Sequence, residues 1–237
     1  MAVSYERAIW EGASLEEANN ALRGKAECYK QLGRYAEASA TLGRVRMFAL
    51  LPEERQEVLY QQELCHFLAG DFAQSATFVG EVEPASKDIL LLHALALAYA
   101  GKFDESEIFA ARFISWDGES PHLQALLDLY AGHPVPRDHT TALVLSFLPP
   151  AGHIYNGRPA EGLLSAGLNA VSVAFTAASL LSGYWVTGIV GGSIALNYTL
   201  MGSIERNAAL VEAQHRDSVL EFGDRVREFL AQTLKPL

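Results

Sequence analysis

The feature that most constrains the fold of this 237-residue chain is a run of 43 residues, Gly162 to Ile204, without a single Asp, Glu, Lys or Arg. A helix needs roughly 20 apolar residues to cross the hydrocarbon core of a bilayer. Residues 162–183 and 186–204 each have about that length, and the SGYW sequence at 182–185 is typical of a tight turn with aromatic rings at headgroup level. We therefore predict a transmembrane helical hairpin. The alternative is an apolar helical pair buried inside a soluble protein.

Small and polar residues within this run favour two helices that pack against each other. Alanine recurs at every fourth position of the first helix, and two glycines have the same spacing in the second, which allows close approach of membrane helices. Two asparagines lie at similar depth from the turn, and a hydrogen bond between them would offset the cost of polar groups in lipid. The predicted packing residues are Ala166, Asn169, Ala170, Ala174, Ala178, Gly188, Gly192 and Asn197.

The stretch SFLPPAGHIYNGRPAEG, residues 146–162, leads into the hairpin. Its two prolines end a short apolar segment, 140–148, that cannot span a bilayer, and its glycines let the chain turn back. We expect Tyr155 and Arg158 to anchor the loop at the membrane interface. The loop residues singled out are Pro149, Pro150, Gly152, His153, Tyr155, Gly157, Arg158 and Gly162.

An enzyme using His153 and Tyr155 is the least supported interpretation of this loop. Neither residue has partners in a recognisable triad order or at metal-ligand spacing, and the glycine spacing is not that of a phosphate-binding loop. We expect no catalytic, cofactor or metal site. We therefore interpret the loop as the segment at which the chain enters the membrane.

The N-terminal half contains an internal repeat. LGRYAEA at 32–38, AGDFAQS at 69–75 and AGKFDES at 100–106 share a glycine, an aromatic residue two positions later, and then Ala or Ser. Each glycine follows a segment with helical apolar periodicity and allows the chain to turn at a helix end. Repeats near 34 residues are typical of a solenoid of stacked helical pairs, and Ser14 with Glu17 has the spacing of a capping box that starts the first helix. We predict an all-α fold.

These repeats resemble the tetratricopeptide repeat family over about 14–132, with Tyr29, Gly33, Tyr35 and Ala38 at its signature positions. The resemblance implies a protein-binding scaffold. A groove of this kind takes a protein or peptide partner, or is filled by the chain itself. In this register the concave face is lined by Asn20, Arg23, Glu27, Lys30, Glu57, Tyr60, Leu64, Phe67, Asp88, Leu91, Leu95 and Ala98.

The segment 141–207 resembles a membrane-domain family with a Pro-Gly-x-Gly-x-x-Tyr-x-Gly loop ahead of a paired-helix hairpin. Pro150 stands at the first glycine of that motif, and His153 replaces a common Gln. Such domains often follow tetratricopeptide-type repeats in bacterial envelope proteins, which implies a location in the bacterial inner membrane.

Two orientations in that membrane stay open. Arg137, Arg158, Arg206 and Arg216 flank the spans on one side, so the positive-inside rule places the repeats in the cytoplasm. The envelope family commonly carries a signal peptide, which would place them in the periplasm. The opening MAVSYERAIWEG lacks the pattern of a signal peptide, although a chain that began after a cleavage site would look the same.

The residues divide the chain into a helical-repeat domain 1–133, a linker 134–140, a hairpin with its loop 141–206, and a C-terminal amphipathic helix 207–237. We expect this helix to dock on the repeats, as a cap on the last repeat or on the concave apolar residues. Its apolar stripe comprises Val219, Phe222, Val226, Phe229 and Leu230.

The net charge of −10 argues against a nucleic-acid partner. The expected partners are a protein or peptide, as the repeat resemblance implies, and the lipid bilayer, from the predicted hairpin. Cys28 and Cys65 are too few for a disulfide scaffold or a zinc site, and form either one bridge or two buried thiols. The leading hypothesis is a non-enzymatic, membrane-anchored helical-repeat adaptor. The alternative is an accessory subunit of an envelope transport or membrane-protein insertion machine with a functional hairpin.

Overall fold

The computed structural model describes residues 2–10, 14–118, 120–135, 139–148 and 150–234. Within these ranges the regular secondary structure is helical throughout and contains no strand, which confirms the all-α class. The chain forms two compact units: the first combines the residues up to His133 with those from Val219 onward, and the second is Pro134–Ser218. Pro149 and residues 136–138 of the predicted linker lie outside the described ranges.

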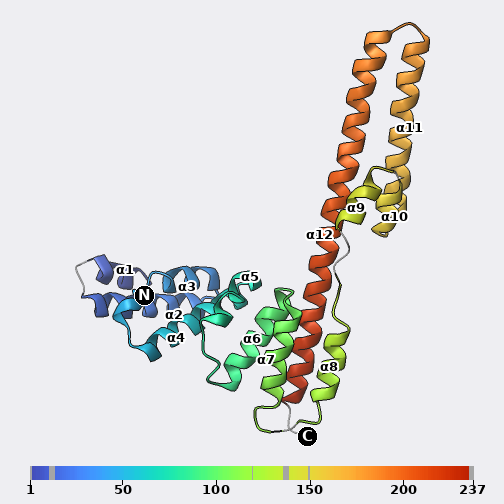
Figure 1. Ribbon diagram of the computed structural model, residues 1–237. Helices are drawn as coiled ribbons and strands as arrows, with labels where there is room; N and C mark the ends of the chain where they lie inside the picture. Colours follow the sequence, from blue (N-terminus) through green and yellow to red (C-terminus); the bar gives the residue numbers. More distant parts are fainter. Residues whose placement is uncertain (1, 11–13, 119, 136–138, 149, 235–237) are drawn as a thin grey trace. The chain divides into compact units, whose positions relative to one another are not determined.

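The first unit is a succession of helices in which each packs against the next along the chain (Figure 1). Short 3₁₀ turns at Met47–Ala49 and Phe78–Gly80 join some of them. The helices are α1 (Ala2–Trp10), α2 (Leu15–Gln31), α3 (Tyr35–Leu42), α4 (Pro52–Leu68), α5 (Phe72–Ser75), α6 (Lys87–Tyr99), α7 (Phe103–Ile114), α8 (Leu123–Ala131) and the last part of α12 (Gly192–Thr233).

Three glycines make the same turn between consecutive helices. Gly33, Gly70 and Gly101 have φ of 69°, 79° and 78°, in the left-handed region that is accessible without strain only to glycine. In all three turns the glycine N–H donates to the carbonyl three residues back, and the next N–H donates to the carbonyl five residues back. The predicted role of these glycines at helix ends is confirmed.

The small residue of each repeat is fully buried at a helix contact. Ala38, Ser75 and Ser106 are 0% exposed. The hydroxyl of Ser75 donates to the carbonyl of Glu63, and that of Ser106 to the carbonyl of Ala94, in both cases 12 residues earlier. Corresponding positions of the second and third repeats therefore make corresponding contacts.

The start of α2 is the predicted capping box. The Ser14 hydroxyl accepts from the Glu17 N–H at 3.2 Å, and the Glu17 carboxylate accepts from the Ser14 N–H at 2.8 Å. The two contacts satisfy donors that the first helical turn leaves unpaired.

The last part of α12 completes the core of α6, α7 and α8. Its side chains Val219, Phe222, Val226 and Leu230 are buried in one apolar cluster with residues of those three helices. The ring of Phe222 lies 4.8 Å from Phe103 on α7 and 5.4 Å from Tyr130 on α8, both edge to face. The C-terminal segment predicted to dock on the N-terminal helices does so from Val219 onward, on α6, α7 and α8.

The second unit contains α9 (His139–Ser146), α10 (Ala151–Tyr155), α11 (Pro159–Leu181) and the first part of α12. After a turn at Gly183, with φ 83°, the chain runs back antiparallel to α11 (Figure 1). Among the described helices, α11 is the one long and apolar enough to cross a membrane by length and composition.

The second predicted span runs on into the C-terminal helix. A π-helical segment, Thr187–Gly191, lies within the apolar run, and α12 then continues without a break from Gly192 to Thr233. Only the part up to Ile204 is uncharged. The C-terminal helix predicted from residue 207 is therefore the continuation of the same helix, because no Pro occurs between 192 and 233 to end it.

Candidate functional site

The inner sides of α2 and α4 enclose a groove in the first unit. Its pocket, about 220 Å³, has an apolar floor of Ala26, Leu42 and Val58, which are at most 4% exposed. Polar side chains of the two helices form the rim: Arg23, Glu27, Lys30, Glu57 and Gln61. Three of the predicted concave residues of the first repeat thus line one pocket.

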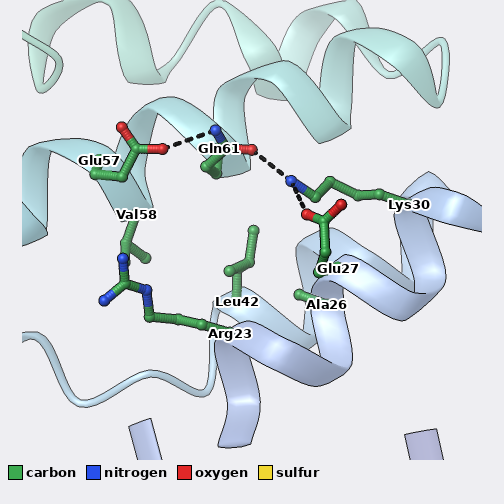
Figure 2. Close-up of a pocket in the computed structure, with 8 residues that line it drawn as sticks. All are labelled: Arg23, Ala26, Glu27, Lys30, Leu42, Glu57, Val58 and Gln61. Atoms are coloured by element: carbon green, nitrogen blue, oxygen red, sulfur yellow. Dashed lines mark hydrogen bonds and ion pairs between the residues drawn. The ribbon is translucent and has the colours of Figure 1, made fainter. Parts of the chain in front are cut away.

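A chain of hydrogen bonds spans the rim of this groove, as Figure 2 shows. The Lys30 ammonium lies 2.6 Å from a carboxylate oxygen of Glu27 and donates to Gln61 Oε1 at 2.8 Å. The Gln61 amide in turn donates to Glu57 at 2.8 Å. Gln61 is not among the concave-face residues that the repeat register predicts. These half-exposed contacts can be exchanged for contacts to a ligand at small cost, because exposed ion pairs contribute little.

A second pocket of about 410 Å³ follows between α4, the segment before α6 and the start of α6. Tyr60, Val82 and Ile89 supply apolar surface to it, and its lining contains four carboxylates and no Lys or Arg. Burial, together with Asp88 and Glu57, raises the pKa of Tyr60, so that its hydroxyl stays a neutral donor. The four carboxylates belong to Glu53, Glu57, Glu83 and Asp88. Glu57 lines both pockets, so they are neighbours, and the two together are here named the α2–α4–α6 groove.

The groove does not extend over all predicted concave residues. Leu95 is buried with Ala98 in the cluster that the last part of α12 completes, and Phe67 and Leu91 pack against that cluster. Leu95 and Ala98 are therefore closed to a partner, whereas Phe67 and Leu91 are half-buried. Leu64 is half-buried and Asn20 is exposed, and neither lines the two pockets.

A buried acid–base pair, which the repeat register did not indicate, lies between α4 and α6. Glu63 and His93 are both 0% exposed, with Glu63 Oε2 3.2 Å from His93 Nε2. Neither side chain has another hydrogen-bond partner among the described residues. Burial raises the pKa of Glu63, against an opposing effect of His93. The contact is electrostatic and structural, since it opens into neither pocket.

The loop before the hairpin is folded back on α12. A Cβ on Gly152 would lie 2.8 Å from the Ser146 hydroxyl oxygen, and one on Gly162 would lie 2.9 Å from Pro150 Cβ, so both glycines permit close backbone approach. Gly157 turns with φ 72°. The role predicted for these glycines is thus a packing role as much as a conformational one.

Polar side chains join this loop to α12. His153, 3% exposed, makes a 3.1 Å contact from Nε2 to the Ser203 hydroxyl. Asn156 donates to Asn207 at 3.1 Å, and Gln214 donates to the Asn156 carbonyl at 2.8 Å. These partners of the loop were not identified from sequence. Arg158 is exposed and lies 3.5 Å from Glu161, and Tyr155 is half-buried.

The packing face of α11 differs from the predicted alanine ridge. Ala170, Ala174 and Ala178 are exposed, and Ala166 is half-buried. The face that meets the returning helix carries Thr176 and Leu180, each two residues from the nearest alanine of the ridge. A Cβ on Gly192 would lie 2.9 Å from Thr176 Cβ, and one on Gly188 would lie 2.9 Å from Leu180. The two glycines therefore have the predicted role, and their neighbours are hydroxyl and leucine side chains.

The predicted asparagine pair is also replaced. Asn169 accepts at 2.7 Å from the Thr199 hydroxyl, and Asn197 is exposed. The reason is geometric: residues at equal distance from a turn face each other only if both helices keep the α-helical phase, and the π-helical segment shifts the phase of the second helix.

Other candidate chemistries find no support within the described residues. Cys28 and Cys65 are free thiols, half-buried and buried respectively, so the two-thiol alternative holds. No group of three or more His, Cys, Asp or Glu side chains there is arranged to hold a metal ion. In comparisons with known proteins, no family model, no curated protein and no solved structure matches the chain.

Proposed function

We propose that the protein is a membrane-anchored helical-repeat scaffold of the tetratricopeptide type, whose α2–α4–α6 groove binds an extended polypeptide segment. The observation that carries this proposal is the division of the concave face into a filled part and an open part. Leu95 and Ala98 are buried in one apolar cluster with the chain's own C-terminal helix, whereas other predicted concave residues of α2 and α4 line pockets: Arg23, Glu27, Lys30, Glu57 and Tyr60. A face that accepts a helical segment at one end is suited to accept a second segment at the other.

The lining of the open part defines the chemistry of the partner. Around Tyr60 and Ile89, the carboxylates of Glu53, Glu57 and Asp88 create a negative field over an apolar surface. The complementary segment carries Lys or Arg next to an aliphatic or aromatic side chain, because charge complementarity guides association while apolar burial provides affinity.

Exposed apolar side chains support the membrane anchor. Soluble proteins rarely expose large contiguous apolar surfaces, and in the second unit such side chains cover the outward faces of both helices of the pair. A bilayer is the environment in which this surface is stable. The exposed residues are Leu163, Leu164, Leu168, Val171, Val173, Phe175, Leu181, Tyr184, Trp185, Val186, Ile189, Val190, Ile194, Tyr198 and Met201.

The groove is tested by site-specific photo-cross-linking in cells that express the full chain. A photoreactive amino acid at Gln61 should form cross-links to another polypeptide, and one at exposed Glu105 on α7 should not. Glu57→Lys with Asp88→Lys should abolish the Gln61 cross-links, and Glu105→Lys should leave them unchanged. Equal cross-linking from both positions, or insensitivity to the charge reversals, would reject the groove.

Membrane residence is tested separately by fractionation. The protein should sediment with membranes and resist extraction at high salt and alkaline pH, since apolar helices are not released by screening of charge. Recovery as a monomer without detergent would reject the anchor. Exchange of the hairpin for an unrelated two-span anchor should preserve partner binding in the cell. Loss of function on exchange would instead favour the transport or insertion alternative.

A further inference from the structure

A pocket of about 360 Å³ lies within the second unit, between α10, α11 and the first part of α12. His153 comes from α10, Glu161, Ser165 and Leu168 from α11, and Ser203 with Arg206 from α12. None of the functions considered above uses this pocket. Its volume is in the range of small-molecule sites, which typically combine apolar walls with a few convergent polar groups.

One end of the pocket is polar and has unused hydrogen-bonding capacity. His153 is 3% exposed and contacts Ser203 through Nε2, while its Nδ1 has no hydrogen-bond partner in the described part of the chain. The buried hydroxyl oxygen of Ser165 is likewise without a partner there. A buried polar group without a partner is destabilising, and a ligand that supplies the missing hydrogen bond would remove this cost. Burial lowers the pKa of His153, so the ring is neutral at pH 7 and its Nδ1 donates or accepts according to tautomer.

A cationic and an anionic side chain lie next to each other at the polar end of the pocket. The Arg206 guanidinium lies 3.1 Å from the Glu161 carboxylate, and both side chains remain partly exposed, at 55% and 33%. A second cation, Arg158, lies 3.5 Å from Glu161. A ligand carrying both a cationic and an anionic group can therefore engage each charge without leaving the other unpaired.

The other end is apolar and extends into the uncharged run. Leu164, Leu168 and Tyr198 line it. From Glu161 to Leu168 the helix rises about 10 Å at 1.5 Å per residue, so the pocket passes from the charged border of the run to its apolar part. This polarity gradient matches an amphiphile whose head lies at the charged border and whose chain lies along the helices.

We propose that this pocket binds a zwitterionic phospholipid with a primary ammonium headgroup, phosphatidylethanolamine, with its phosphate at Arg206, its ammonium at Glu161 and an acyl chain along Leu164, Leu168 and Tyr198. The ammonium also supplies donors for unpartnered acceptors at the polar end. The inference rests on the membrane residence in the proposed function, and it is independent of the groove.

The glycines of the unit provide a matched pair of variants that leaves the charges intact. Gly202 lines the pocket, and a Cβ there would meet no atom within 4 Å, so Gly202→Leu places a side chain at the pocket from a backbone position that accepts a Cβ. Gly167 has the same open surroundings and does not line the pocket, which makes Gly167→Leu the control. In native mass spectrometry of the detergent-solubilised full chain with dioleoyl phosphatidylethanolamine, Gly202→Leu should weaken lipid binding about tenfold or more, and Gly167→Leu should not change it.

The headgroup is tested with dioleoyl phosphatidylglycerol, which has the phosphate and no ammonium. Wild-type protein should prefer the ethanolamine lipid, Glu161→Gln should remove that preference, and Arg206→Gln should weaken binding of both lipids. A preference for phosphatidylglycerol, or one insensitive to Glu161→Gln, would overturn the zwitterionic assignment. Binding unaffected by Gly202→Leu would overturn the pocket itself.

Failure of this inference is distinguishable from failure of the proposed function. If the chain resists alkaline extraction and binds neither lipid in this pocket, the anchor stands and the lipid site is wrong. If the chain is recovered as a monomer without detergent, the anchor is wrong whatever lipid it binds.

Discussion

The Tyr99 hydroxyl donates a 2.6 Å hydrogen bond to Asp224 Oδ1, which joins the end of α6 to a helix 125 residues further along the chain. Burial and the contact with Asp224 raise the pKa of Tyr99, so that the hydroxyl stays protonated and able to donate. Beside this bond, Gly223 lets the two helices approach, since a Cβ there would lie 2.5 Å from the Tyr99 ring. The contact sets the register in which α12 closes the core of the first unit.

Tyr99→Phe should lower the free energy of unfolding by about 1 kcal/mol, because it removes one hydrogen bond to a carboxylate that is itself half-exposed. Chemical denaturation of the detergent-solubilised full chain measures this. In a double-mutant cycle with Asp224→Asn, the two losses should be less than additive. Additive losses would show that the bond does not contribute to stability.

Phe222→Ala should destabilise the protein by about 3–5 kcal/mol, because Phe222 is 0% exposed and packs against two aromatic rings, so that truncation leaves a cavity. Leu234→Ala, near the end of the same chain segment, is the control, since Leu234 is 51% exposed. Thermal melting followed by circular dichroism compares the two. Equal melting temperatures would contradict the docking of α12 on the repeats.

His93→Leu should cost about 3–5 kcal/mol, because it leaves the Glu63 carboxylate buried without a counter-charge. Glu63→Leu with His93→Leu should be less destabilising than His93→Leu alone. In His93→Leu the raised pKa of Glu63 should also appear as pH dependence: stability is complete below the ordinary value of 4.5 and falls as pH rises above it. A flat profile in denaturation between pH 4 and 7 would count against the buried charge.

Glu6 should produce the opposite pH dependence. Hydrogen bonds from Arg44 and Lys25 lower its pKa to about 2, so its contribution is present above 4.5 and is lost as pH falls from there towards 2. The loss should not exceed about 1 kcal/mol, because the side chain is 32% exposed and its ion pairs are screened. Glu6→Gln should flatten this part of the profile. An unchanged profile would show that α1 is not held through these ion pairs.

Gly192→Leu should lower the melting temperature of the detergent-solubilised protein, because the new side chain would meet Thr176 where the two helices of the pair approach most closely. Gly167→Leu places the same side chain on α11 where a Cβ meets nothing within 4 Å, and should have little effect. If the two variants melt alike, the helices are not packed through the Gly188 and Gly192 face.

Features that depend on local chemistry could be predicted from the sequence. The turns at Gly33, Gly70 and Gly101 follow from a conformation that other residues adopt only with strain, and the capping box at Ser14 from contacts within one helical turn. The apolar stripe of the C-terminal helix was predictable for a similar reason, since helical periodicity alone identifies the face that must be buried.

The sequence does not predict in the same way which face of one helix packs against another. The alanines of α11 form a continuous ridge in sequence, and yet Thr176 and Leu180 meet the glycines of the returning helix. A difference of one residue rotates a helix face by about 100°, and the phase of the second helix depends on the π-helical segment at 187–191. The rotational phase of the second helix therefore decides which polar residues pair across the two helices.

The sequence by itself determined an all-helical chain with repeated glycine turns, one long uncharged run and a C-terminal helix with a face to bury. Each of these is encoded in local conformational preference or in the cost of burying charge. The tertiary structure alone decided that Leu95 shares a buried cluster with α12 while Glu57 lines an open pocket, and that Glu63 meets His93 in the core. These outcomes depend on which apolar surfaces come close enough to pack against one another. The spacing of residues along the chain does not specify this.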